Sequence, residues 1–180
     1  LALEDWEWIN GNDKPFSKIS YERENNERAR WLTEDEEKRL LESSPEWLCE
    51  IIVFALNTGL RQGELLSLEW NRVNLFRKTI LIQKTKNSKP KTVPLNQIAM
   101  DVILRKSEEK VRRIKNDFVF VSSHGTKIDR HNLRRAFNSA VRKAEIVDFK
   151  FHDLRHSFCT KLAQRGVDIY KIAKLAGHED

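Results

Sequence analysis

The chain has 180 residues, of which 39% are hydrophobic and 33% are charged, a composition that fits one globular domain and excludes a disordered polymer. The longest apolar run, IIVFAL at residues 51–56, is far too short to span a bilayer, and no basic-then-apolar signal segment opens the chain. The net charge of +6 favours an anionic partner, and two cysteines, Cys49 and Cys159, are too few for a disulfide framework.

Residues 1–30 show no sustained periodicity, and a glycine and a proline in turn contexts are followed by a polar run. This pattern predicts an interdomain linker or the remnant of a preceding domain. A domain is expected to start at residue 31, because Thr33 and Glu36 have the spacing of a capping box. The helix that they begin is predicted to end at about Glu42.

A second helix is predicted over residues 46–57, with Ser44 as its N-cap and Pro45 at its first turn. Its second half is almost entirely apolar, so it is expected to lie at the centre of the domain. Gly59 is expected to end it. The next segment, RQGELLSL, predicts a short helix.

The hydrophobic period then shortens to that of a strand. The runs KTILIQK and KPKTVPL, at residues 78–84 and 89–95, predict the two strands of a hairpin, and RVNL at residues 72–75 predicts a third strand. The segment TKNS between the two runs places Lys86 and Lys89 at or near the predicted hairpin tip.

Four more helices are predicted after the hairpin, with the short extended segment DFVFVS between the first and the second. The architecture expected from these elements is α+β, mostly helical, with a small antiparallel sheet on one edge. The residues expected to bound these helices or to face the core are Asn96 and Lys106 for the first, Asp129 for the second, Leu154, Phe158, Leu162 and Gly166 for the third, and Asp168, Ile169, Ile172, Ala173 and Gly177 for the fourth.

Basic residues form three clusters, at residues 84–92, 105–115 and 130–143. A single cluster of this kind is usually a solvated face. Three clusters in one chain favour a phosphate backbone as the partner.

The segment FHDLRHSF, residues 151–158, places two histidines, an arginine and an aspartate close together. His152 and Arg155 are three residues apart and so share one face of a helix. His152 and His156 have the i, i+4 spacing of zinc ligands, which leaves a metal-dependent hydrolase as an alternative function. The glutamate of the metalloprotease motif and a third ligand are missing from this segment, so no metal is predicted.

Arg61 lies in the segment TGLRQGE between two glycines, where the backbone can turn tightly and admit an anion. The alternative is that Arg61 forms only a surface ion pair with Glu64, three residues further on.

Three segments together resemble the catalytic domain of the tyrosine recombinases, the phage integrase family. They are NTGLRQGELLSLEWNRVNL, KTKNSKPKTVPLN and FHDLRHSFCTKLAQRGVDIYKIAKLAGH, and both their order and their spacing agree with that family. The resemblance runs from about Arg30 to the end of the chain. It implies a phage-integrase-like catalytic core over residues 31–180, with the N-terminal DNA-clamping domain of the family preceding the linker.

The resemblance also implies roles for single residues. Arg61 and Arg155 correspond to the two catalytic arginines, and Glu64 to the acid that holds the first of them. Lys86 corresponds to the hairpin lysine, the general acid for the leaving 5′-oxygen. His152 corresponds to the base or hydrogen-bond partner of the phosphate.

His178 corresponds to the last residue of the catalytic set. The basic clusters add residues that are expected to contact DNA, namely Lys84, Lys89, Lys91, Arg130 and Arg134.

The reaction of the family is a transesterification in which a tyrosine attacks the scissile phosphate and a 5′-hydroxyl later reverses the 3′-phosphotyrosyl link. The energy of the phosphate bond is kept, so no metal, ATP or other cofactor is implied. The family's tyrosine lies a little over two helical turns beyond the last histidine, whereas this sequence ends two residues after His178. Its two tyrosines, Tyr21 and Tyr170, both lie before His178.

The chain is therefore expected to be a recombinase fragment, incomplete at its C-terminus, that binds double-stranded DNA without cleaving it. A monomer is expected, although full-length recombinases of this kind act as tetramers on paired DNA sites. The expected location is the cytoplasm of a bacterial or phage-infected cell, with no membrane partner. A non-catalytic DNA-binding module with the same fold is the remaining alternative.

Overall fold

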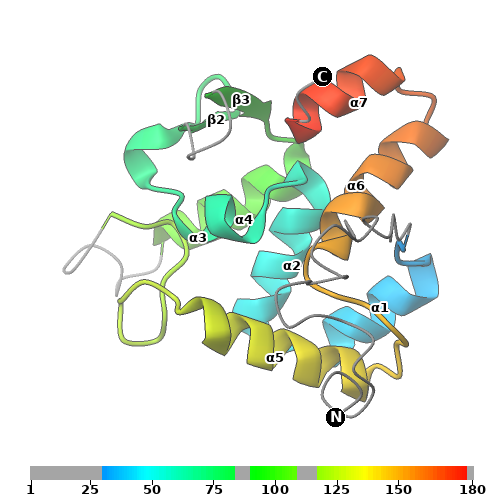
Figure 1. Ribbon diagram of the computed structural model, residues 1–180. Helices are drawn as coiled ribbons and strands as arrows, with labels where there is room; N and C mark the ends of the chain where they lie inside the picture. Colours follow the sequence, from blue (N-terminus) through cyan, green and yellow to red (C-terminus); the bar gives the residue numbers. More distant parts are fainter. Residues whose placement is uncertain (1–29, 84–89, 109–116, 178–180) are drawn as a thin grey trace, which may run out of the picture.

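The computed structural model describes residues 30–83, 90–108 and 117–177. Within these ranges the chain forms seven α-helices, one 3-10 turn (Trp70–Arg72) and a three-stranded antiparallel sheet, which lies at one edge of the helical domain (Figure 1). The predicted α+β architecture is therefore confirmed. No helix in the described ranges combines the length and the apolar character that crossing a membrane requires.

Helix α1, Glu34–Glu42, begins with the capping box that the sequence predicts and ends where predicted. The amide of Glu36 donates to Thr33 Oγ1 over 3.2 Å, and the amide of Thr33 donates to Glu36 Oε2 over 3.0 Å. These two bonds satisfy amide groups that a helix start otherwise leaves unpaired.

Helix α2, Glu46–Thr58, is the central helix of the domain (Figure 1). Most of its residues are buried, and it packs against α4 and α6. Its N-cap is Pro45, so the prediction that Ser44 caps this helix is wrong. The Ser44 hydroxyl instead donates to the carbonyl of Leu40 over 2.7 Å, which associates Ser44 with the end of α1.

The predicted hairpin strands and the third strand are all present. Ile80 in the second strand lies opposite Val93 in the third, and both are buried. The expected hairpin tip, residues 85–88, lies outside the described residues. In chain order and in sheet order the strands are β1 (Val73–Asn74), β2 (Thr79–Ile82) and β3 (Lys91–Pro94).

The predicted helix caps later in the chain are also confirmed. Asn96, Asp129 and Asp168 each accept a backbone amide at the start of a helix. The segment DFVFVS makes only isolated bridges within the described residues. The remaining helices are α3 (Gln62–Leu66), α4 (Gln97–Glu108), α5 (Arg130–Lys143), α6 (Asp153–Gln164) and α7 (Ile169–Ala176).

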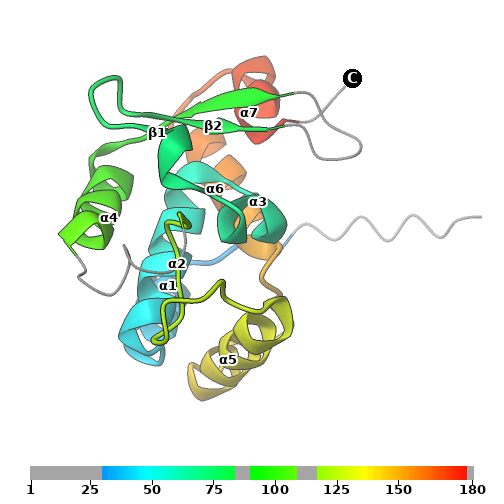
Figure 2. The ribbon, with the colours of Figure 1, turned by 90° about the vertical axis from the view of Figure 1, so that its left-hand side faces the viewer.

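Helix α7 lies against β3 and α6, beside the sheet in Figure 2. Ile172 and Ala176 are buried, but Ile169 is 66% exposed, so its predicted inward position is wrong. The reason is tertiary: periodicity identifies the inner face of a helix but not how far along the helix the domain covers that face.

Candidate functional site

Four elements meet near the C-terminal end of α2, and three of them contribute a cation. Arg61 is the N-cap residue of α3, Arg155 lies in the first turn of α6, and Lys91 begins β3. The fourth element is the C-terminal end of α7, whose carbonyls at Ala176 and Gly177 accept hydrogen bonds from two of these cations. We refer to Arg61, Lys91 and Arg155 as the cationic cluster.

A buried carboxylate, that of Glu64, holds the cationic cluster together. The Glu64 side chain is 2% exposed, whereas that of Arg61 is 40% exposed. Glu64 Oε1 accepts from Arg61 Nη1 over 3.2 Å, and Oε2 accepts from the Arg61 backbone amide over 2.9 Å. The ion pair between Arg61 and Glu64 is therefore present, but its carboxylate is buried, so it is not a surface ion pair, and part of the Arg61 guanidinium stays exposed.

Lys91, at the start of β3, contacts the same carboxylate, that of Glu64. Its Nζ lies 3.4 Å from Glu64 Oε2 and donates to the Ala176 carbonyl over 3.1 Å, with the side chain 13% exposed. Burial lowers the pKa of Lys91, and the positive charges of Arg155 and Arg61 lower it further, while Glu64 opposes the shift. Lys91 thus lies inside the cluster, and the DNA contact predicted for it stays a prediction.

Arg155 carries a guanidinium that the described protein groups satisfy only in part. The residue is 3% exposed, and Nη1 donates to the Gly59 carbonyl over 2.9 Å. Its buried Nη2 has no hydrogen-bond partner among the described residues. Burial, followed by repulsion from Arg61, lowers the pKa of Arg155. Because a buried donor without an acceptor costs roughly 1–3 kcal/mol, the site favours an additional acceptor such as an anion.

Gly59 makes the contact with Arg155 possible. It ends α2 in the left-handed conformation, with φ +65°. A Cβ at this position would lie 2.4 Å from Cδ1 of Phe158, one turn after Arg155 on α6. The turn and the close approach both require glycine, and together they direct the Gly59 carbonyl to Arg155.

His152 lies exposed at the start of α6, beside the cluster. Its ring packs edge-on against that of His156, with 5.1 Å between the centroids. Partial burial of the ring lowers the pKa of His152, and the charges of His156 and Arg155 lower it further. The imidazole is therefore neutral at pH 7 and can accept a proton. In the described part of the chain, no group of three or more His, Cys, Asp or Glu residues is placed to hold a metal ion.

Other residues predicted for the site are placed only in part. Arg130 and Arg134 are exposed and one turn apart on α5. The start of α5 adjoins α3, where Gln62 Nε2 approaches the Arg130 carbonyl to 3.4 Å. The two arginines are therefore exposed on an element that adjoins α3, and their DNA contacts stay predictions. The residues outside the described ranges are Lys84, Lys86, Lys89 and His178.

The sequence contained one signal for the inward position of Lys91. Alternate residues of a strand face the same side, so Lys91 shares a side with Val93, which is buried. The backbone carbonyls at Gly59 and Ala176 had no comparable signal, because every residue carries a carbonyl and only the fold selects which ones converge.

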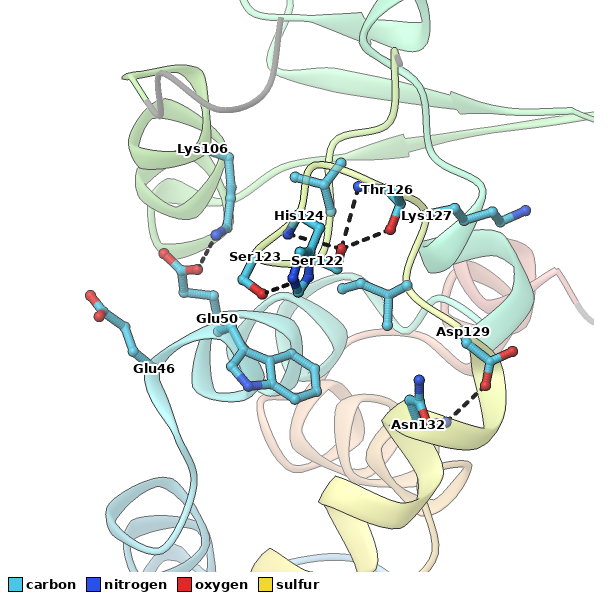
Figure 3. Close-up of a pocket in the computed structure, with 13 residues that line it drawn as sticks. Glu46, Glu50, Lys106, Ser122, Ser123, His124, Thr126, Lys127, Asp129 and Asn132 are labelled. Carbon is cyan, nitrogen blue, oxygen red and sulfur yellow. Dashed lines mark hydrogen bonds and ion pairs between the residues drawn. The ribbon is translucent and has the colours of Figure 1, made fainter. Parts of the chain in front are cut away.

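A cavity of about 750 Å³ lies at the other end of α2 (Figure 3). Its lining includes Glu46 and Glu50 in α2, and Lys106 of α4 pairs with Glu50. Trp47 of α2, the loop of residues 121–128 and the start of α5 complete the lining. No residue predicted for the site lines this cavity, so the cationic cluster is the candidate site.

Comparison with known proteins shows which proteins this chain resembles as a whole. The sequence profile of the phage integrase family matches residues 30–180. The integrase of Salmonella phage P22 is 33% identical over 190 residues, which cover 99% of this chain and 48% of that protein. The chain spans about half the length of the curated relatives that it matches.

Solved structures share the fold. The XerA recombinase superposes with a TM-score of 0.70 and 27% identity, over 83% of this chain and 55% of that one. The XerH site-specific recombinase, bound to its difH substrate in a pre-cleavage complex, superposes with a TM-score of 0.67 and 25% identity, over 83% of this chain and 47% of that one.

Proposed function

Because this chain belongs to the phage integrase family, we propose that it is the catalytic region of a site-specific DNA recombinase and that the cationic cluster binds a DNA phosphate. The observation that carries the proposal is the buried Arg155 Nη2, which has no acceptor among the described residues. Phosphate oxygens are strong acceptors, and arginine can bind two of them at once. The DNA substrate of the related XerH recombinase supports the same class of partner.

The proposed reaction is a transesterification at phosphorus. A tyrosine oxygen forms a bond to phosphorus while the bond from phosphorus to the 5′-oxygen breaks, so the number of phosphoester bonds does not change. Arg61 and Arg155 stabilise the negative charge that develops on the other phosphate oxygens. Lys86 is the proposed donor of the proton that the leaving 5′-oxygen takes, and neutral His152 accepts a proton or a hydrogen bond on the attacking side.

A further part of the proposal is that residues 1–180 alone bind DNA without cleaving it. The two tyrosines of the printed sequence are Tyr21, outside the described residues, and Tyr170. Tyr170 lies in the first turn of α7, whereas the cluster contacts the other end of that helix at Ala176. Six residues of helix separate the two positions by roughly 9 Å, which keeps the Tyr170 backbone away from the cluster.

We also propose that residues 31–180 form the catalytic domain, that residues 1–30 act as a linker to a DNA-clamping domain, and that this chain alone is a monomer. A tetramer on paired DNA sites is proposed for the whole recombinase. His178 is the proposed last member of the catalytic set.

DNA binding tests the phosphate site directly. If about six phosphates are contacted, affinity for duplex DNA should fall roughly 10³-fold between 50 and 200 mM salt. Arg155→Ala should weaken binding more than Arg165→Ala, which removes the same charge from the exposed end of α6. Fluorescence anisotropy measures both, with circular dichroism as the check that each variant is folded. Affinity that is insensitive to salt, or equal losses in the two variants, would contradict the proposal.

A nicked suicide substrate tests the chemistry, because it traps a covalent protein–DNA adduct. The 180-residue chain should give none. An adduct on Tyr170 would show that the proposed geometry of the site is wrong. The alternative of a non-catalytic module shares the DNA binding, so cleavage by the whole protein, and not binding, separates the two.

A further inference from the structure

Lys91 joins three elements that the chain brings together from distant segments. It begins β3, its Nζ lies 3.4 Å from Oε2 of Glu64 in α3, and it donates over 3.1 Å to the Ala176 carbonyl at the end of α7. Arg61 makes the parallel pair of contacts, to Glu64 and to the Gly177 carbonyl, but the latter is longer at 3.3 Å. Lys91 therefore makes the shorter contact to α7, whereas Arg61 makes the shorter contact to the buried carboxylate.

The stem of Lys91 also lies directly beneath the end of α7. A Cβ added at Gly177 would lie 3.0 Å from Lys91 Cδ and 3.2 Å from its Nζ, so this glycine leaves room for the lysine. A cation at the C-terminal end of a helix interacts favourably with the helix dipole and with the last carbonyls. The contact consequently stabilises the last turn of α7 at its observed position.

This arrangement is unfavourable for an ammonium group in other respects. The side chain is 13% exposed and shares the cluster with two arginines, and burial together with their repulsion lowers its pKa. An apolar residue at this inward strand position would avoid that cost, because a buried charge repays its desolvation only when it is well paired. The presence of a lysine here is therefore explained better by its contact with the end of α7 than by a gain in the free energy of unfolding.

We propose that Lys91 is a positioning residue whose ammonium group ties the C-terminal end of α7 to Glu64, and so sets the position of Gly177 relative to Arg61. The link between α7 and Glu64 does not rest on the proposed function, because the described contacts alone define it.

Amide hydrogen exchange of the free chain tests the link. In Lys91→Met the amide of Gly177, which donates to the Lys174 carbonyl, should exchange roughly 10-fold faster or more, the loss expected for a hydrogen bond from a charged donor. Lys91→Arg should keep most of the protection, because it keeps the charge. Lys171→Met, which removes an exposed charge from the same helix, should match the wild type. Unchanged protection in Lys91→Met would overturn the proposal.

A pH series on the unsubstituted lysine covers the case in which Lys91→Met fails to fold. The groups that face Lys91 are Glu64, Arg61, Arg155 and the Cys159 thiol, so the series uses a Cys159→Ser background. As pH rises through the lowered pKa of Lys91, the exchange rate of the Gly177 amide should increase more steeply than the intrinsic exchange rate of an unprotected amide. The same background with Lys91→Arg should show no such step, because arginine stays charged. If the pH profiles of the Gly177 amide were identical with lysine and with arginine at position 91, the proposed link would be rejected.

A failure of the proposed function can be distinguished from a failure of the positioning role of Lys91. If the wild-type chain does not bind duplex DNA, the proposed function fails while the exchange data still decide the role of Lys91. If DNA binds and the exchange data show no effect of position 91, only the positioning role fails.

Discussion

Replacing Gly59 with alanine should destabilise the domain by about 2–5 kcal/mol, the sum of two costs. The first is the left-handed backbone, with φ +65°, in which an L side chain costs about 1–2 kcal/mol. The second is steric, because the new Cβ would lie 2.4 Å from Cδ1 and 2.8 Å from Cε1 of Phe158. Displacing this buried ring adds roughly 1–3 kcal/mol.

Gly166→Ala is the matched control, because Gly166 has φ +75° and no atom within 4 Å of its added Cβ. It should lose only the backbone cost, about 1–2 kcal/mol. Urea unfolding followed by circular dichroism gives both free energies of unfolding. Adding Phe158→Leu to Gly59→Ala should recover part of the steric cost in a double-mutant cycle. Equal losses in the two glycine variants would refute the argument that Phe158 closes on Gly59.

Two further outcomes follow from the lowered and raised pKa values in the site. An NMR titration of the His152 ring should give a pKa below 6.5. The unfolded chain then binds more protons than the folded chain at low pH. This histidine should therefore make the fold less stable as pH falls below about 6.5. Cys159, whose pKa burial raises while Arg155 and Lys91 oppose the shift, should be alkylated more slowly when duplex DNA neutralises the cluster. Cys49 is the internal reference, because its charged neighbours are Glu50 and Glu46; equal slowing of both thiols would argue against phosphate binding at the cluster.

Local rules predicted the elements whose ends depend on a few adjacent residues. Thr33, Asp129 and Asp168 accept amides from the helices that directly follow them, so sequence spacing was enough. Ser44 was assigned to the wrong helix, because the spacing of the sequence does not show which of two adjacent helix ends a serine between them joins. The exposure of Ile169 likewise depends on how far the rest of the domain extends along α7.

The candidate site was predictable to a different degree for each kind of group. Arg61 and Arg155 were identified through the family resemblance, and the structure places their guanidinium groups close enough to repel each other. Their carbonyl partners could not be found in this way, because Gly59 and Gly177 contribute backbone oxygens, which carry no sequence signature. Lys91 was predicted only as a DNA contact, from its basic cluster, although the alternation of the strand indicated that it shares a side with the buried Val93.

The acceptor that orients Arg155 belongs to the main chain, and this determines which mutations the site tolerates. Any amino acid at position 59 would still present a carbonyl oxygen, so no single exchange of side chain can delete this acceptor. What a mutation can change is the direction in which the oxygen points, through the tight turn at the end of α2 or through the ring of Phe158 that packs on it. Damage to the Arg155 site should therefore arise in neighbours that shape the backbone, and a mutational scan that scores only charged residues would miss them.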